Sequence, residues 1–462
     1  MKLSKLKEKL ELKIGESRFR NLKKNFKNYK LQGKNLDLDK VKIIGITGSR
    51  GKSSTAFLVH KYLQLKGFKS ILYSSISIDS PCSNIKKNSS CEIPINNETG
   101  LLNLLDEADC YKADYIIVEI NESTISKGLV NDIPFDMRVL TNLNPKHNNE
   151  QYEEQEYVNL KKSFLKDVSS KEDCICVLGV QDYDKNLFNE LFSINNCKKI
   201  FYSSEYIADV KNIDKSNINS LLVGLNSSLS GLDLEFIMDN KKYDLHTNLL
   251  MPHNSLNILG AITILNALGE YDHDLFKKYI KNVELPGRVE VIKANGRTII
   301  IDLFLTPTLE ILRKFKEKGE VKNIRVITGA IGTNFKTWNS KFKDEKFIST
   351  RSESRKFAMN IVNKFADYVY ITQNDNAAEN LEDICKELQS YLETNVISDI
   401  IYDRKAAIEK AIIDSEKGDI IFVSGRGNRK ILCVSETKAE LLLDKDVVID
   451  VLDKLGWSKY GL

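Results

Sequence analysis

The stretch that decides the fold is GITGSRGKSST, Gly45 to Thr55. It completes the apolar run KIIGIT and leads into the amphipathic segment AFLVHKYLQLKG, so strand, glycine loop and helix follow in that order. Glycines at 45, 48 and 51 let the backbone turn its N–H groups toward phosphate oxygens, Lys52 adds a cation, and the Ser53 hydroxyl can reach magnesium. The stretch therefore predicts a phosphate-binding loop.

Around this loop, short apolar runs alternate with helical segments, which indicates a parallel sheet with crossover helices. The expected strands are KIIGIT at 42–47, SILYSS at 70–75, DYIIVEI at 114–120, MRVLTNL at 137–143 and CICVLGV at 174–180. Residues 196 to about 250 mix short strand-like pieces with Asn, Ser and Gly, so we expect antiparallel hairpins inserted into this body. A helix is expected from about Asn254 to Leu268.

A second alternating series follows Leu285-Pro286-Gly287-Arg288, with strands expected at 298–304, 324–330, 367–372 and 419–425. The predicted fold class is α/β, built as a P-loop-containing central domain with a parallel sheet and a small antiparallel insertion, followed by a Rossmann-like C-terminal domain. The expected divisions are a short basic helical segment at 1–40, the central domain at 41–285 and the C-terminal domain at 286–462.

Composition excludes several other classes. The 68 Lys and Arg against 64 Asp and Glu leave a net charge of +4, so no overall field favours nucleic acid or a membrane surface. The chain has no C-x-x-C for a zinc ribbon, no signal-peptide core and no run of 18 apolar residues. We expect a cytoplasmic protein whose basic N-terminal segment is a solvated helix docked on the body or an arm that touches an anionic substrate or nucleic acid.

The pattern T-G-x-x-G-K-[ST] in Thr47 to Ser53 resembles the ATP loop of the Mur ligase family, above all of its UDP-MurNAc-tripeptide synthetase-like members, and of the related folylpolyglutamate synthases. The general Walker A pattern is not met, because Ile46 stands where its first glycine belongs. The resemblance implies ATP and magnesium, with two ions expected. The ATP contacts it implies in this loop are Thr47, Gly48, Ser49, Arg50, Gly51, Lys52, Ser53 and Ser54.

Strand position predicts one metal ligand, and the resemblance implies the others. Glu119 ends the strand DYIIVEI near the phosphate loop, where a carboxylate can hold magnesium beside Ser53. The segment from Thr141 to Leu165 resembles the family segment in which a histidine binds the second magnesium and a carbamylated lysine supports the metal site. His147 and Lys161 fall on those positions, although Lys146 replaces the family's aspartate before the histidine.

The remaining nucleotide contacts are also implied by resemblance. Asn257 is the expected adenine contact, whereas Asn254 could equally cap the helix. Arg288, in Leu285-Pro286-Gly287-Arg288-Val289-Glu290, is the candidate for the γ-phosphate, and Asp302 for the ribose. The expected catalytic residues are Lys52, Lys161, His147 and Arg288.

The expected reaction is amide-bond formation through an acyl phosphate with release of ADP and phosphate, between a small-molecule carboxylate acceptor and an amino acid or amine. Ala377 stands where diaminopimelate-adding members have the arginine of D-N-P-R. Only about 40 residues precede the phosphate strand, so we expect the chain to lack the full N-terminal domain that binds the UDP-sugar in the peptidoglycan ligases. We therefore expect specialised metabolite or polymer synthesis first, with peptidoglycan-precursor or folylpolyglutamate-type ligation as alternatives and non-catalytic ATP binding as the least favoured. No oligomeric state and no nucleic-acid partner is predicted.

Overall fold

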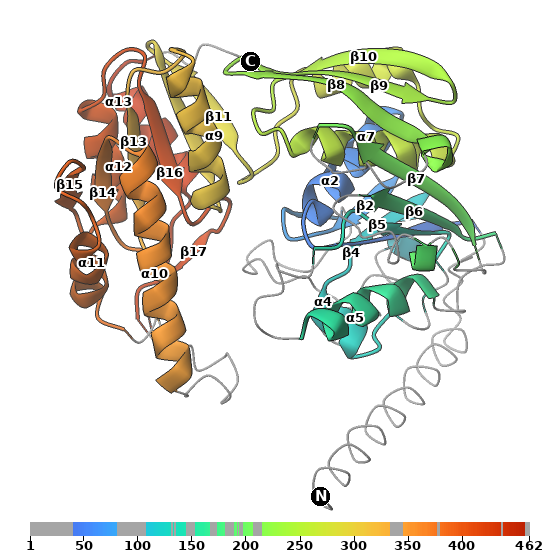
Figure 1. Cartoon of the computed structure of the whole chain (residues 1–462), viewed down its shortest axis with the longest axis horizontal. Helices are drawn as coiled ribbons and strands as arrows, with labels where there is room; N and C mark the ends of the chain where they lie inside the picture. The colour runs from blue at the N-terminus through green and yellow to red at the C-terminus, as the bar shows by residue number, and fades with distance from the viewer. Residues whose placement is uncertain are drawn as a thin grey trace, which may run out of the picture. The chain divides into compact units, whose positions relative to one another are not determined.

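The computed structural model forms two compact units, which are described separately (Figure 1). The first runs up to Asn226 and includes Leu232–Thr247 and Pro252–Lys281, and the second is Asn282–Leu462 with the short pieces Ser227–Gly231 and Asn248–Met251. The residues that the structure describes are 40–80, 108–130, 133, 135–144, 153–166, 173–180, 189–191, 193, 197–206, 215–332, 345–376, 379–435 and 438–457. The predicted helical segment at 1–40 lies almost wholly outside them.

The first unit is built on one large sheet whose strand order is β10-β9-β8-β7-β6-β5-β1-β4-β2-β3. Its strands are β1 Lys42–Thr47, β2 Ser70–Tyr73, β3 Ile78–Asp79, β4 Tyr115–Glu119, β5 Met137–Leu140, β6 Ile175–Val180, β7 Lys198–Ser204, β8 Ser220–Ser228, β9 Gly231–Met238 and β10 Lys241–Thr247. β1 lies between β4 and β5 and is parallel to both. The carboxyl ends of these three strands therefore meet at one edge of the sheet, as in other α/β proteins.

The antiparallel part of this unit continues the main sheet. We expected hairpins inserted into the α/β body, but β7 pairs in parallel with β8, and only then does the antiparallel pair β9 and β10 follow. β9 alternates buried and exposed residues, with Leu232, Leu234, Phe236 and Met238 buried, so one of its faces is covered. The Asn, Ser and Gly residues that suggested hairpins say nothing about which strand a hairpin joins.

Helices cover both faces of this sheet. They are α2 Lys52–Leu65, α4 Glu122–Ser126, α5 Glu154–Lys166, α7 Asn254–Ala267 and α8 His273–Ile280, with a 3₁₀ turn η3 at Lys215–Asn217. α2 packs on α7, while α4 packs on α5, and Figure 1 shows these two pairs on opposite sides of the strands. α7 is apolar around most of its circumference because it lies in the interior against α2, β6 and β7.

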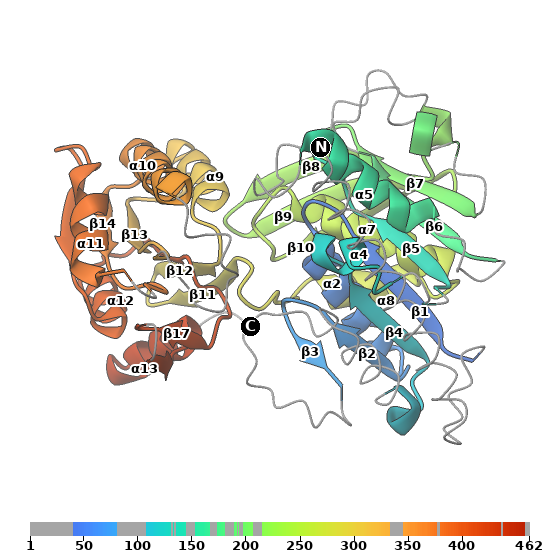
Figure 2. The ribbon, with the colours of Figure 1, turned by 90° about the horizontal axis from the view of Figure 1, so that it is seen from below.

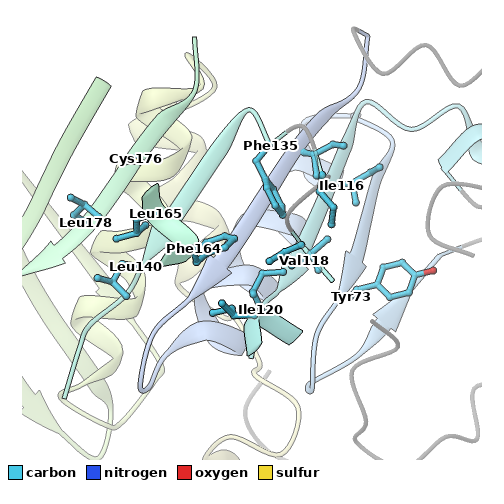
Figure 3. Packing of buried hydrophobic residues seen from close by; sticks show 14 of the residues in the cluster. Tyr73, Ile116, Val118, Ile120, Phe135, Leu140, Phe164, Leu165, Cys176 and Leu178 are labelled. Carbon is cyan, nitrogen blue, oxygen red and sulfur yellow. The ribbon is translucent and has the colours of Figure 1, made fainter. Parts of the chain in front are cut away.

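An aromatic pair joins α5 to the centre of the sheet (Figure 3). Phe135, just before β5, meets Phe164 of α5 edge to face, with ring centroids 5.5 Å apart. A Cβ on Gly45 of β1 would stand 2.6 Å from the Phe135 ring, so the strand needs glycine where the two rings lie. The buried Arg138 guanidinium lies 5.1 Å from both ring centroids and donates to the Phe164 carbonyl, which fixes α5 over β5.

The second unit has a six-stranded sheet of order β11-β12-β16-β13-β14-β15, with only the β11–β12 pair antiparallel. Its strands are β11 Glu290–Ala294, β12 Arg297–Asp302, β13 Ile324–Thr328, β14 Tyr368–Ile371, β15 Ile397–Ile400 and β16 Ile420–Ser424, with β17 Ile431–Cys433 and β18 Ala439–Leu441 as a separate small sheet. Its helices are α9 Thr306–Glu317, α10 Glu345–Phe365, α11 Leu381–Ser390, α12 Arg404–Ile413 and α13 Asp444–Lys454.

The helices of this unit also lie on both faces of the sheet. Figure 2 shows α9 and α10 on one side and α12 and α13 on the other, and each side has its own apolar core. The predicted α/β fold class is confirmed, with a large, mainly parallel sheet in one unit and a second sheet in the other. Among the described residues, no helix is both long enough and apolar enough to cross a bilayer.

A buried ion pair ties four segments of this second sheet together. Arg404 at the start of α12 and Asp444 at the start of α13 are both fully buried, and they pair through two bonds of 2.8 Å. Arg404 also donates to the carbonyls of Ser424, at the end of β16, and Gln373, after β14. The guanidinium thus satisfies backbone carbonyls at two strand ends while its charge is neutralised by Asp444.

Candidate active site

The glycine loop lies between the end of β1 at Thr47 and the start of α2 at Lys52. Its last residue, Gly51, is the N-cap of α2, with φ of 79°, and the first turn of α2 contains no acidic residue. The first backbone N–H groups of a helix have no partner within the helix, and the helix dipole favours an anion there. The end of α2 is therefore suited to a phosphate group.

Two glycines of the loop are required by close contacts as well as by their dihedral angles. Gly48 has φ of 144°, and a Cβ there would stand 2.0 Å from Oγ1 of Thr141. At Gly51, a Cβ would stand 2.2 Å from Oδ1 of Asn257. Any side chain at either position would force the loop apart, so the loop and its neighbours form one closely fitted surface.

The segment after β5 holds the loop in place. Thr141 Oγ1 donates to the Arg50 carbonyl at 2.6 Å, and Asn142 Oδ1 accepts from the Arg50 N–H at 3.0 Å. The Asn142 carbonyl accepts from the Ser49 N–H at 3.1 Å, and the Asn144 N–H donates to Ser49 Oγ at 2.8 Å. The sequence indicated this Thr-Asn segment only through its resemblance to the family. The structure gives its first residues a direct part in shaping the loop.

The Lys52 side chain folds back and contacts the glycine loop that precedes it. Its Nζ donates to the carbonyl of Gly48 at 2.8 Å and to that of Ser49 at 3.4 Å. The next two residues, Ser53 and Ser54, are buried in the first turn of α2, whereas Arg50 is exposed. The loop thus carries its cation beside the phosphate-binding end of α2.

A serine after β2 joins the two predicted magnesium ligands. Ser53 Oγ lies 2.7 Å from Ser75 Oγ, and the Ser75 backbone N–H donates to Glu119 Oε2 at 2.8 Å. Glu119 is only 3% exposed, at the carboxyl end of β4. A hydroxyl and a carboxylate held near each other beside a phosphate loop are the oxygen ligands that magnesium prefers, so these residues fit one ion. Ser75 was missed, although it too follows a parallel strand.

Lys161 of α5 lies directly behind the loop. Its fully buried Nζ donates to Thr47 Oγ1 at 2.9 Å and pairs with Glu122 Oε1 at 2.6 Å. The pKa of Lys161 is lowered to about 7, first by burial and then by the charge of Lys52, while Glu122 acts in the opposite direction. The pKa of Glu122 is lowered, because the attraction of Lys161 and Lys52 outweighs the effect of its burial. Glu122 was not among our predicted site residues.

Tyr157 completes this corner of the site. Its hydroxyl lies 2.9 Å from Ser49 Oγ and 3.5 Å from Glu122 Oε1, and Lys161 Nζ lies 5.6 Å from the centroid of its ring. Burial raises the pKa of Tyr157 to about 12, so its hydroxyl remains a hydrogen-bond donor at neutral pH. α5 therefore presents a cation and a phenol to the underside of the loop.

The predicted second metal ligand cannot be placed, because His147 and the neighbouring Lys146 lie outside the described residues. Within the described ranges, no three His, Cys, Asp or Glu side chains come close enough together to hold a metal ion. The structure thus brings together Ser53, Glu119 and the loop, and it places Lys161 beside them as an ion-paired amine. The second magnesium stays a prediction.

The two asparagines of α7 lie against the loop. The N-cap of α7 is His253, with no side-chain capping bond, so the expectation that Asn254 could cap the helix is wrong. Instead, Asn254 Oδ1 accepts from Asn257 Nδ2 at 2.9 Å, and both side chains are buried. Asn257, the predicted adenine contact, is thereby oriented with its Oδ1 against Gly51.

The other two predicted nucleotide contacts belong to the second unit. The Arg288 guanidinium lies 5.2 Å from the ring centroid of the exposed Phe304, and its buried Nη1 has no hydrogen-bond partner in the described part of the chain. Asp302 is buried and accepts from Thr308 Oγ1 at 2.6 Å, and burial raises its pKa to about 6. The adjacent Val289 has φ of 58°, a strained value for a β-branched residue.

Three arginines of the second unit, Arg351, Arg355 and Arg426, are candidates for binding the carboxylate of an incoming amino acid. The Arg355 guanidinium pairs with Glu379 and Glu387, and the fully buried Arg426 guanidinium pairs with Asp375 at 2.7 Å. The side chain of Arg351 and the residue Ala377 lie outside what the structure describes. The guanidinium groups of Arg355 and Arg426 are thus already paired with carboxylates of the protein. Neither is free to bind a substrate carboxylate unless its ion pair breaks.

A phosphate loop between a parallel strand and a helix, with an adjacent carboxylate for magnesium, is the arrangement of α/β proteins that bind nucleoside triphosphates. Comparison with known proteins gives the family of the chain. Residues 46–265 match the model of the Mur ligase middle domain, and residues 287–427 match that of the Mur ligase, glutamate ligase domain. The chain belongs to the Mur ligase family, and it is an enzyme of the ADP-forming amide ligase class.

Curated relatives resemble the chain over most of its length. The UDP-N-acetylmuramoyl-L-alanyl-D-glutamate--2,6-diaminopimelate ligase of Helicobacter pylori is 24% identical over 417 residues, which cover 89% of this chain and 84% of the relative. The UDP-N-acetylmuramyl-tripeptide synthetase of Borreliella afzelii is 24% identical over 438 residues, covering 90% and 77%. Both names describe peptidoglycan-precursor ligation, the alternative that we had placed second.

Solved structures share the fold at lower identity. A MurF ligase from Thermotoga maritima in complex with ADP superposes with a TM-score of 0.58 at 17% identity, covering 90% of this chain and 80% of that one. A folylpolyglutamate synthase from the same organism gives a TM-score of 0.58 at 15% identity, covering 89% and 93%. These likenesses establish the architecture of the chain.

Proposed function

We propose that the chain joins an amino acid or amine to the carboxylate of a peptide-bearing cell-wall precursor, with conversion of ATP to ADP and phosphate. The observation that carries the proposal is the fitted loop from Thr47 to Ser54, with Glu119 held beside Ser53 through Ser75. The names of the Helicobacter and Borreliella relatives support the cell-wall acceptor. They favour it over the specialised metabolite or polymer that we expected first.

In the proposed reaction, an acceptor carboxylate oxygen attacks the γ-phosphorus of ATP, and the bond to the β-phosphate oxygen breaks to release ADP. The amine then attacks the carbonyl of the acyl phosphate, and the amide forms as phosphate leaves and the amine loses a proton to solvent. Lys52 would exchange its bonds to the Gly48 and Ser49 carbonyls for phosphate oxygens, and the first turn of α2 would donate N–H groups.

Magnesium, when bound, would neutralise phosphate charge, and Ser53 and Glu119 are the residues placed to hold it. A second ion at His147, Arg288 at the γ-phosphate and Asp302 at the ribose remain parts of the proposal. The buried Nη1 of Arg288, which has no hydrogen-bond partner among the described residues, supports a role in binding an anion. Since the reaction consumes ATP, we propose the cytoplasm as its location.

The amino acid is the open part of the proposal. Diaminopimelate is disfavoured, because alanine at position 377 cannot replace a guanidinium in pairing with a carboxylate. Arg355 and Arg426 are paired internally, so recognition by either would require an existing ion pair to break. A panel of amino acids is therefore needed in the test.

The test measures ADP release with Mg-ATP, UDP-MurNAc-dipeptide and single amino acids, followed by mass spectrometry of the product. Lys52→Ala removes the loop cation, while Lys61→Ala is the matched control on the same helix, since Lys61 pairs with Asp79 outside the loop. We expect acceptor-dependent ADP and a new amide in the wild type and the control, and neither in Lys52→Ala.

The outcomes separate the parts of the proposal. AMP in place of ADP would refute the acyl-phosphate route. ADP and an amide formed only with an acceptor outside the cell-wall class would keep the ligase and reject the cell-wall precursor. ATP turnover that survives in Lys52→Ala would reject the phosphate loop as the catalytic nucleotide site.

A further inference from the structure

A buried tyrosine outside the glycine loop contacts the segment that shapes it. Tyr202 of β7 is 1% exposed, and its hydroxyl donates to the carbonyl of Thr141 at 3.1 Å. We infer that Tyr202 is a positioning residue for the nucleotide: acting through Thr141, it holds the loop in the form that binds phosphate. The inference rests on the proposed nucleotide-binding role of the loop and adds a residue to it.

Tyr202 reaches Thr141 across an intervening strand. β6 lies between β5 and β7, and Gly179 of β6 is the register partner of Tyr202. A Cβ on Gly179 would stand 2.7 Å from Tyr202 Oη and 2.1 Å from the Thr141 carbonyl oxygen. A side chain at this position would therefore force the phenol and the carbonyl apart, so the glycine in β6 is what allows the two groups to meet.

Thr141 in turn contacts the loop at both ends of its turn from Gly48 to Arg50. Its N–H donates to the Thr47 carbonyl at 2.9 Å, and its Oγ1 donates to the Arg50 carbonyl at 2.6 Å. Its Oγ1 also stands 2.0 Å from the point where a Cβ on Gly48 would lie. A shift of Thr141 would therefore change the directions of the loop N–H groups that are to bind phosphate.

The Tyr202 hydroxyl also contacts the helix on the other side of the loop. A Cβ on Gly260 of α7 would stand 2.9 Å from Tyr202 Oη, so the hydroxyl lies directly against the helix backbone. Asn257, whose Oδ1 lies against Gly51, is three residues earlier and on the same face of α7. Tyr202 thus lies between Thr141 and α7, which are the two neighbours that fit closely against Gly48 and Gly51.

The chemical state of Tyr202 suits a positioning role. Burial raises the pKa of its phenol well above the usual range, so the hydroxyl stays protonated and donates throughout the neutral pH range. Its hydrogen bond is spent on a backbone carbonyl, and the side chain has almost no exposed surface. We therefore expect its loss to lower nucleotide affinity and to leave the chemical step little changed.

The experiment compares two Tyr→Phe variants of the full chain. Tyr62 is the matched control, because it is also fully buried and its hydroxyl donates to the Asp272 carbonyl at the same distance, 3.1 Å. In Tyr202→Phe, the Kd for Mg-ADP from calorimetry and the KM for Mg-ATP should rise about three- to tenfold, while kcat changes little. Tyr62→Phe should lower the melting temperature to a similar extent and keep the wild-type affinity.

A double-mutant cycle tests the route through Thr141. Thr141→Val removes the bond to the Arg50 carbonyl, which still accepts from Asn142 Nδ2 at 2.9 Å. Tyr202→Phe should cost less Mg-ADP affinity in the Thr141→Val background than in the wild type. An equal cost in both backgrounds would overturn the inference, because Tyr202 would then not act through Thr141.

Two further results would overturn it. One is a folded Tyr202→Phe that binds Mg-ADP as tightly as the wild type, and the other is an equal loss of affinity in Tyr62→Phe, which would mark the effect as general destabilisation. Failure of the ligase proposal would show instead in the wild type, as an absence of acceptor-dependent ADP release. Mg-ADP binding would still report on Tyr202 in that case.

Discussion

Oδ1 of Asn257 stands 2.2 Å from the point where a Cβ on Gly51 would lie, so α7 closes over the end of the phosphate loop. We predict that Gly51→Ala weakens Mg-ADP binding by at least about tenfold, because the methyl group clashes and φ of 79° strains an L-residue by roughly 1–3 kcal/mol. Isothermal titration calorimetry would measure the loss.

Gly67→Ala is the matched control for this variant. Gly67 also has positive φ, 91°, but nothing lies within 4 Å of a Cβ placed there. It should lower stability through backbone strain and leave ADP affinity unchanged. Gly51→Ala should cost less ADP affinity in an Asn257→Ala background than in the wild type, and an equal cost in both backgrounds would show that the contact with Asn257 is not the cause.

Glu119→Gln should raise the magnesium concentration needed for half-maximal ADP release by about tenfold or more. The amide keeps the shape and can still accept from the Ser75 N–H, but it lacks the negative charge that a hard cation prefers. Steady-state rates across a magnesium titration test this, with the exposed Glu235→Gln as a control for loss of one carboxylate. An unchanged magnesium requirement would remove Glu119 from the metal site.

Because Asp302 is buried, the free energy of unfolding of the second unit should depend on pH through this residue. Burial raises its pKa to about 6, above about 3.9 in an unfolded chain. Its protonated form therefore contributes fully below about pH 4, and this contribution is lost as pH rises through 6. The free energy of unfolding of Asp302→Asn should rise relative to that of the wild type between pH 4 and 7, by roughly 3 kcal/mol at most.

Tryptophan fluorescence is a suitable signal for that measurement, because both tryptophans of the chain, at positions 338 and 457, fall in the unit that contains Asp302. Urea unfolding at pH 4, 5.5 and 7 would give the difference at each pH. A constant difference between variant and wild type would mean that Asp302 titrates at its ordinary value.

Breaking the buried Arg404–Asp444 pair should cost about 3–5 kcal/mol, because Asp444→Ala leaves an unneutralised guanidinium in a dry site. The double variant Arg404→Met/Asp444→Leu should be markedly more stable than Asp444→Ala, since it buries no charge. Urea unfolding of the three proteins measures this. If Asp444→Ala were as stable as the wild type, water would have to reach the Arg404 guanidinium.

The strands were the part of the fold best predicted from sequence. KIIGIT became β1 with the same bounds, Lys42–Thr47, and DIIFVSG contains β16, Ile420–Ser424. A parallel strand buried on both faces is apolar along its whole length, so its limits are visible in the sequence. The place of β8 to β10 at the edge of the main sheet was not visible, because an alternating pattern fixes which face is covered and not which neighbour is paired.

The site was predicted unevenly for a similar reason. The loop was recognisable because its glycines, Lys52 and Ser53 are contiguous, and backbone turn and ligand chemistry coincide in one short stretch. Ser75 and Glu119 are 44 residues apart in the sequence, and Lys161 is 114 residues from Thr47. No periodicity connects such positions. Glu122 could have been noticed only by asking which side chains α4 and α5 present to each other.

The self-contacts of Lys52 have a consequence for selectivity among small anions. An exposed ammonium at a helix end would attract any phosphate or sulfate in the cell, but here the charge is already directed at the Gly48 and Ser49 carbonyls. A competing anion gains the full attraction only if it also draws Lys52 away from those carbonyls. A single inorganic phosphate offers few contacts with which to do so, whereas a polyphosphate chain can follow the loop from α2 to Lys52. The resting loop is thus screened against inorganic phosphate, a product of the proposed reaction.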